Sequence, residues 1–175
     1  FQQEYKTREK RRIEYLMKMS GIQRIKFLSD FDWTFNPKIP AKDNGVPQTD
    51  FLHKPSNLVL IGSAGVGKTH IATALCHEAI LKGLQTVFVT LFEFTSKLSK
   101  TKSLYSFIEY YARVPLLCLD ELGYVFPTKD QADCIFQIIS KRSEVRTTII
   151  TTNLIPSQWG KIFDSTTASA ILDRL

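Results

Sequence analysis

"NLVLIGSAGVGKTHIATALCHEAILKG", residues 57–83, is the stretch that decides the fold of this chain. It opens with a short apolar run at 57–61, which predicts a strand buried on both faces. The pattern of residues 68–82 predicts a helix, and the glycine at position 83 closes it. A strand, a glycine-rich loop and a helix in this order form the repeating unit of a parallel sheet, so the stretch predicts an α/β fold.

The loop between strand and helix, GSAGVGKT at 62–69, fits the P-loop pattern G-x-x-x-x-G-K-[ST]. Its glycines let the backbone N–H groups turn inward, and the positive end of the helix dipole adds to them, so the loop can cradle a triphosphate. Lys68 is expected to reach the β- and γ-phosphates, and Thr69 to offer its hydroxyl to Mg²⁺. The competing interpretation is a glycine-rich turn that binds nothing. The predicted binding stretch comprises Gly62, Ser63, Ala64, Gly65, Val66, Gly67, Lys68, Thr69 and His70.

The same alternation continues through the rest of the chain. Continuous apolar strands that alternate with helices indicate a parallel sheet with helices on both faces. Further strands are predicted at 86–90, 115–119 and 147–151, and further helices at 91–112 with a break near 100, at 129–142 and at 166–175.

Two carboxylates follow the third apolar run, in LLCLDE at 116–121. Open α/β sheets place their ligand chemistry at the ends of strands, which is where this pair is expected. Asp120 is predicted to hold Mg²⁺ in its outer shell, and Glu121 to polarise the attacking water. A solvated pair of charges is the alternative, and the P-loop upstream favours the functional interpretation.

The fourth apolar run leads directly into Thr152 and Asn153. An asparagine at the tip of a strand beside the carboxylates could hydrogen-bond the γ-phosphate or its water, although asparagine is also an ordinary turn former. Arg174, near the end of the chain, cannot be assigned from spacing alone, because a helix-surface arginine is usually only that.

Positive charge gathers in the first 26 residues. They hold eight Lys or Arg against three Glu, a net charge of +5 out of the +6 of the whole chain. Residues 3–19 predict a basic helix, whose field should favour polyanions such as nucleic acid. A solvated helix face is an equally good interpretation of such a charge run. We expect three parts: a basic helical segment at 1–28, a linker at 29–56 that docks on the core, and the core at 57–175. The docking side chains are expected to be Phe31, Trp33 and Phe35.

Cysteine, histidine and hydropathy patterns point to a cytoplasmic protein. The three cysteines lie far apart in apolar stretches without a CxxC pair, as reduced core residues do. The three histidines show no metal-ligand spacing, and the apolar runs are too short to span a bilayer. The chain begins without Met and stops within a helical pattern, so we expect a piece of a longer protein. The residues concerned are Cys76, Cys118, Cys134, His53, His70 and His77.

Taken in order, GSAGVGKT, LLCLDE, TTN and DRL resemble the AAA+ ATPases, and more narrowly the branch that contains the helicase loader DnaC and the transposition helper IstB. Further runs favour the IstB-like family: SDFDWTFNP, DELGYV, QADCIFQIISKR, TTNLIPSQWGKIF and AILDRL. Trp159 and Gly160 are the traits that separate the chain from DnaC. The resemblance covers about residues 22–175. Two departures stand out: the region 95–105 is shorter than the family's helical insertion, and the small C-terminal lid is absent.

The resemblance implies an ATPase with ATP and Mg²⁺ as cofactors. It assigns Asn153 the sensor-1 role and Arg174 the arginine finger that completes a neighbour's site. It also implies a homo-oligomer on double-stranded DNA that activates or targets the transposase of the same mobile element. A DnaC-like helicase loader is the alternative and shares every nucleotide residue. A P-loop kinase would need an acceptor pocket and lid arginines, and neither is visible in the sequence. A non-enzymatic DNA-coating protein, in which ATP only switches assembly, would not need a water-activating carboxylate, so Glu121 argues against it.

Overall fold

A four-stranded parallel sheet forms the centre of the described chain, which in the computed structural model comprises residues 2–34 and 54–175. The strands are β1 (Leu58–Ile61), β2 (Thr86–Thr90), β3 (Leu116–Leu122) and β4 (Thr147–Thr152), and their order in the sheet is β1-β4-β3-β2. This arrangement confirms the predicted α/β fold with a parallel sheet. The expectations for Phe35 and His53 lie outside the described residues.

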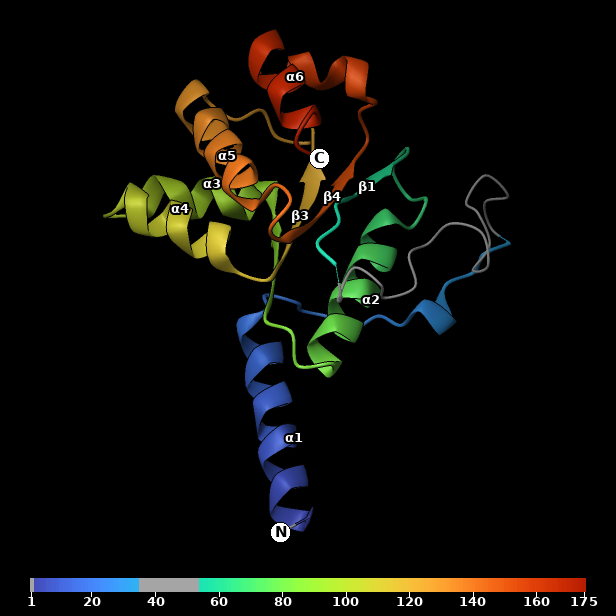
Figure 1. Ribbon diagram of the computed structural model, residues 1–175. Helices are drawn as coiled ribbons and strands as arrows, with labels where there is room; N and C mark the ends of the chain where they lie inside the picture. Colours follow the sequence, from blue (N-terminus) through green and yellow to red (C-terminus); the bar gives the residue numbers. More distant parts are fainter. Residues whose placement is uncertain (1, 35–53) are drawn as a thin grey trace.

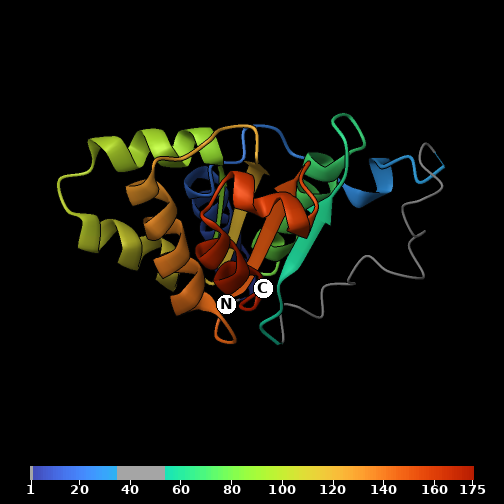
Figure 2. The same cartoon turned by 90° about the horizontal axis from the view of Figure 1, so that it is seen from above.

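Helices cover both faces of the sheet because alternate residues of each buried strand point to opposite sides. On β3, Leu116 and Cys118 pack against α2 (Lys68–Leu81), whereas Leu117 and Leu119 belong to a second core cluster on the other face. Figures 1 and 2 show α2 on one side of the sheet and the helices that enclose the second cluster on the other. Those helices are α3 (Leu91–Lys100), α4 (Leu104–Arg113), α5 (Lys129–Arg142) and α6 (Ser165–Leu172).

Most predicted elements are confirmed, and two boundaries are wrong. The break predicted near residue 100 separates α3 from α4, where the Ser103 side chain accepts a hydrogen bond from the Ser106 N–H and starts the new helix. The strand predicted at 115–119 continues to Leu122, and the helix predicted to run to residue 175 ends at Leu172. All three cysteines are free and buried, as expected for core residues.

The first helix, α1 (Gln2–Met19), stands out from the body of the molecule (Figure 1). It is held near its C-terminal end, where Leu16 is buried and Arg12 Nη2 donates to the carbonyl of Gly83 at 3.1 Å. The chain then runs past the edge of β2, and the carbonyl of Ser20 accepts a hydrogen bond from the Phe88 N–H at 2.7 Å. None of the helices in the described ranges combines the length and apolar character needed to cross a membrane. The boundaries expected near residues 28 and 56 stay predictions.

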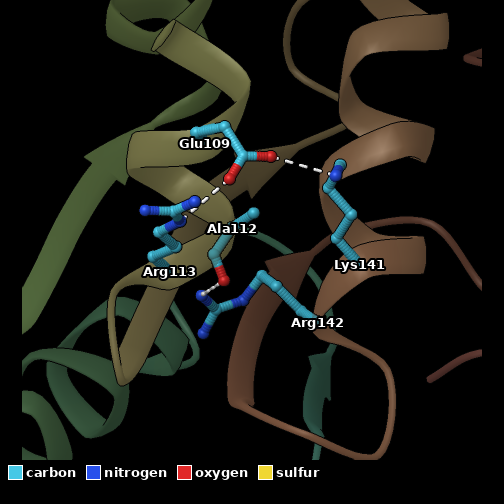
Figure 3. A network of polar contacts seen from close by, with 5 residues as sticks. All are labelled: Glu109, Ala112, Arg113, Lys141 and Arg142. Carbon is cyan, nitrogen blue, oxygen red and sulfur yellow. Dashed lines mark hydrogen bonds and ion pairs between the residues drawn. The ribbon is translucent and has the colours of Figure 1, made fainter. Parts of the chain in front are cut away.

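A polar network ties α4 to α5 and to the beginning of β4. Figure 3 shows its part between the two helices, where Arg142 donates to the carbonyl of Ala112 at 3.4 Å. The guanidinium of Arg142 is 1% exposed and donates to the carbonyls of Tyr111 at 2.8 Å and Val114 at 2.6 Å, near the end of α4, as well as to the carbonyl of Thr147. Burial lowers the pKa of Arg142 to about 9, while these carbonyl oxygens favour its charged form. The network therefore joins the end of α4 to the beginning of β4.

A second contact in the same network lies at its exposed rim. The carboxylate of Glu109 accepts from Lys141 of α5 at 3.0 Å and from Arg113 of its own helix at 2.8 Å (Figure 3). The hydrogen bond from Lys141 is the largest cause that holds the pKa of Glu109 below its ordinary value. This pair therefore helps to hold α4 against α5.

Candidate functional site

The loop between β1 and α2 has the backbone that a phosphate cradle requires. Gly65 and Gly67 have φ angles of 80° and 92°, in the left-handed region that side chains with a Cβ rarely adopt. Gly67 is also the residue before the first turn of α2, and a Cβ there would lie 2.3 Å from the ring of Phe31. The glycine is thus needed twice, once for the turn and once for the close approach of the chain segment that follows η1 (Leu28–Asp30).

Lys68 reaches back over this loop from the start of α2. Its ammonium donates to the carbonyl of Gly62 at 2.8 Å and to the carbonyl of Ser63 at 2.7 Å. Burial lowers the pKa of Lys68 below its ordinary value, and the negative charges of Asp120 and Glu121 oppose that shift. The structure therefore brings the predicted phosphate-binding cation into the electrostatic range of the predicted acids.

Thr69 and Asp120 meet directly, although they come from α2 and β3. The Thr69 hydroxyl lies 3.1 Å from both carboxylate oxygens of Asp120, which is 2% exposed. Because the carboxylate accepts the hydroxyl proton, the lone pairs of the Thr69 oxygen stay available to a cation. Hydroxyl and carboxylate oxygens are the ligands that Mg²⁺ prefers, so this pair fits a magnesium site with Asp120 behind Thr69.

A β-bulge displays Glu121 at the end of β3. Leu119 pairs with Ile150 and Leu122 with Thr152, so two residues of β3 stand opposite the single residue Thr151 of β4. Glu121 has a φ of 62°, a conformation that is uncommon without glycine and marks local strain. The extra residue lets the strand continue to Leu122 while Asp120 stays buried and Glu121 is exposed.

Asn153 follows β4 and lies against the turn that follows β3. A Cβ on Gly123 would lie 2.7 Å from Asn153 Oδ1, and Gly123 has a φ of 100°. The side-chain amide of Asn153 therefore lies against Gly123, which comes two positions after Glu121 in the turn that follows β3. Its predicted contact with the γ-phosphate or water stays a prediction.

His70 contacts the N-terminal segment and also lines the cavity beside Thr69 and the acids. Its Nε2 lies 2.9 Å from the carbonyl of Phe27, and its ring makes an edge contact with Phe31 at 5.4 Å between centroids. Trp33 in turn packs edge-on against Phe31 at 4.8 Å. His70 thus holds the segment around Phe31 against the start of α2, and its direct contact with nucleotide stays a prediction.

Arg174 is the one predicted site residue that the structure places with a different part of the fold. Its Nη1 donates to the carbonyl of Ala170 at 2.7 Å, and its guanidinium lies 5.1 Å from the centre of the Phe136 ring on α5. Its backbone carbonyl accepts from Asn57 at 3.1 Å and from Ser143 at 3.2 Å. A role in a neighbouring subunit's site stays a prediction.

A cavity of about 540 Å³ opens beside the carboxylates. Thr69 and both acids line one side, and residues 21–24 together with Lys26 line the other. Sequence reasoning missed this wall, because nothing in the composition of residues 21–26 places them near the P-loop.

Sequence reasoning also missed Thr151 and Gly123. Both stand immediately beside predicted site residues, Thr151 two positions before Asn153 and Gly123 two positions after Glu121. The available signals were a threonine directly after the apolar pair Ile149 and Ile150, and a glycine two positions after Glu121. Neither signal reveals the partner without the strand register.

The comparisons with known proteins agree with this geometry. The family described as IstB-like ATP binding protein matches residues 1–175. A protein named for ATP binding in insertion sequence IS232 of Bacillus thuringiensis subsp. berliner is 34% identical over 177 residues, which cover 98% of this chain and 71% of the relative. The corresponding protein of insertion sequence IS21 from Pseudomonas aeruginosa is 34% identical over 179 residues, which cover 99% and 68%.

A solved structure gives the same fold. The crystal structure of the DnaC helicase loader is 26% identical, has a TM-score of 0.59, and matches 71% of this chain and 80% of its own. Together, the P-loop geometry, the family match and the relatives lead to one conclusion. The chain belongs to the family of IstB-like ATP-binding proteins, within the AAA+ class of P-loop ATPases.

Proposed function

We propose that this chain hydrolyses ATP, assembles on double-stranded DNA, and in that state activates or targets the transposase of the same mobile element. The observation that carries the hydrolysis step is the meeting of Thr69 with Asp120 beside the displayed Glu121. The insertion-sequence names of the relatives carry the link to transposition.

The residues divide the chemistry among themselves. The loop N–H groups and Lys68 bind and orient the phosphates, and Thr69 offers its oxygen to the metal while Asp120 accepts its proton. Mg²⁺, when bound, neutralises charge that develops on the β- and γ-phosphate oxygens. Glu121 orients the attacking water and takes up its proton, and Asn153 holds the water or the γ-phosphate.

The DNA step of the proposal rests on α1. This helix extends away from the body of the molecule (Figure 1), and residues 2–11, which include Lys6, Arg8, Lys10 and Arg11, are exposed and so open to a duplex. Contacts of this kind are mostly with phosphates and carry little sequence preference. The transposase is the partner that an ATP-dependent assembly on the target DNA would direct.

The test of hydrolysis compares Lys68→Ala with Glu121→Gln in the complete protein. Lys68→Ala is expected to abolish ATP binding, measured by fluorescent nucleotide titration. Glu121→Gln is expected to keep ATP affinity within about threefold of the parent and to reduce turnover by roughly 10²–10⁴, the range for loss of a general base. Parent-like turnover in Glu121→Gln would assign the base to another residue.

A replicative helicase loader is the second candidate, because the DnaC helicase loader shares the fold at 26% identity. The two candidates predict the same nucleotide chemistry and differ in the partner. A pull-down with the purified transposase of the same element and with the replicative helicase of the same cell separates them. ATP-dependent binding to the helicase alone would favour the loader.

A further inference from the structure

The hydroxyl of Thr151 connects both acids of the site. It accepts a hydrogen bond from the backbone N–H of Glu121 at 2.9 Å and donates to Oδ1 of Asp120. Thr151 is 1% exposed, so these bonds are made without competition from water. One side chain of β4 therefore holds the backbone of one acid and the carboxylate of the other.

The strand register explains why this position alone can do so. At the bulge, the pair Asp120 and Glu121 faces the single residue Thr151, while the pairs on either side are in ordinary register. The bulge shifts the register at Glu121, and a buried N–H without an acceptor costs free energy. The threonine oxygen accepts from the Glu121 N–H and so satisfies the strained residue.

The proton of Thr151 has a second effect, on the metal side. The carboxylate of Asp120 accepts from Thr151 and from Thr69, whose hydroxyls come from β4 and α2. The hydrogen bond from Thr151 holds the Asp120 carboxylate in one orientation relative to Thr69. The Thr69 oxygen then keeps its lone pairs directed away from Asp120, toward the space at the loop.

We propose that Thr151 is a positioning residue for ATP hydrolysis, which sets the direction of Glu121 through its backbone N–H and the orientation of the Thr69–Asp120 pair through its proton. The inference rests on the proposed ATPase function. It assigns a role to the hydroxyl and not to the bulk of the side chain, so valine, which has the same shape, is expected to lose the role and serine to keep it.

The kinetic test compares Thr151→Val and Thr151→Ser with the parent in the complete protein. Thr151→Val is expected to lower kcat by roughly 10–100-fold, the range for outer partners of metal ligands, with KM for ATP changed less than about threefold. Thr151→Ser is expected to restore kcat to within about threefold of the parent. Thr148→Val is the matched control, because Thr148 is equally buried on β4 and its hydroxyl bonds Arg142 at 3.0 Å, at the other end of the strand.

The control is expected to lower the melting temperature as Thr151→Val does while it leaves kcat unchanged. Two further measurements do not depend on turnover. Hydrogen exchange at the Glu121 amide, followed by NMR, is expected to accelerate at least tenfold in Thr151→Val. Titration of Mn²⁺ into the complex with a non-hydrolysable ATP analogue is expected to show weaker metal binding in that variant, and serine is expected to reverse both effects.

The outcomes separate this inference from the proposed function. Parent-like kcat in Thr151→Val, or an equal loss of kcat in Thr148→Val, would overturn the positioning role. If the parent itself does not hydrolyse ATP, the proposed function fails, and the amide and Mn²⁺ measurements then decide the role of Thr151. Unchanged exchange at Glu121 together with unchanged Mn²⁺ affinity would overturn it in that case.

Discussion

At the scale of single residues, Arg142 shows how one buried side chain fixes the spacing of several elements. Its guanidinium donates to carbonyls at the end of α4, to the carbonyl of Thr147 at the start of β4 and to the hydroxyl of Thr148. The carbonyls of Tyr111 and Val114 lie at the C-terminal end of α4, where the helix dipole also favours a cation. A buried cation is stable here because many partial negative charges surround it.

Replacing Arg142 with methionine is therefore expected to destabilise the fold strongly. The side-chain volume is largely kept, but several buried carbonyls lose their donor, and each unsatisfied group costs about 1–3 kcal/mol. We expect the free energy of unfolding, measured by urea denaturation, to fall by roughly 2–5 kcal/mol. Arg113→Met, on the neighbouring helix α4, is the control, since Arg113 is exposed and its pair with Glu109 contributes about 1 kcal/mol or less. An equal loss of stability in both variants would contradict the structural role assigned to Arg142.

At the scale of elements, α1 combines a small anchor with a large exposed surface. Leu16 and Arg12 hold its C-terminal end to the core, whereas residues 2–11 are exposed throughout. A helix with this division presents charge without contributing much to the core. Its exposed cations are thus available to phosphates, as the proposed DNA contact requires.

The double substitution Lys6→Gln with Arg11→Gln tests this use of α1. Each lost phosphate contact is expected to reduce the slope of log affinity against log salt by about 0.9, so the slope for duplex binding should fall by up to about 2. Fluorescence anisotropy at several salt concentrations measures it. The matched control is Lys129→Gln with Lys161→Gln, which removes the same charge from exposed sites on α5 and near α6. If both double variants lower the slope equally, only net charge is acting and α1 is not the contact.

At the scale of the whole molecule, the candidate site and Arg174 lie on different parts of the fold. The P-loop, Asp120 and Glu121 gather at one end of the sheet, while Arg174 packs on Phe136 of α5. An arginine from a neighbouring copy would complete the site only in an assembly. Such residues raise turnover by about 10³–10⁵ in other phosphoryl-transfer enzymes.

Mixing experiments with the complete protein test whether Arg174 acts between subunits. Arg174→Ala and Glu121→Gln are each expected to be poor ATPases, and a mixture of the two is expected to regain activity. In the mixture, a subunit with an intact Glu121 meets a neighbour with an intact Arg174. Glu121→Gln mixed with Lys68→Ala is the control. In that mixture every subunit lacks either Lys68 or Glu121 in its own site, so an intact Arg174 from a neighbour cannot restore activity. Failure of the first mixture to exceed the control would leave Arg174 as a surface residue of its own chain.

The local patterns of the chain were sufficient to predict the architecture and to propose several residues that the structure brings together at the candidate site. Apolar runs of strand length that alternate with helical runs predicted a parallel sheet, and the structure has that sheet. The motif at 62–69 predicted the loop before α2, because its glycines, lysine and threonine act within eight consecutive residues. Asp120 and Glu121 were found because a charged pair directly behind a buried strand is itself a local signal.

Contacts between strands and between distant segments were decided only by the tertiary structure. Nothing near Thr151 in the sequence indicates that it faces two residues of β3, because a bulge becomes visible only when the register of both strands is known. The same holds for Phe31 against Gly67 and for Arg142 at the end of α4. Sequence periodicity indicates which face of an element is buried, and this was enough to predict the parallel sheet and the strand ends that carry polar residues. The contact partners of a residue are set only when packing brings distant segments together. Such contacts determine how Asp120 and Glu121 are held.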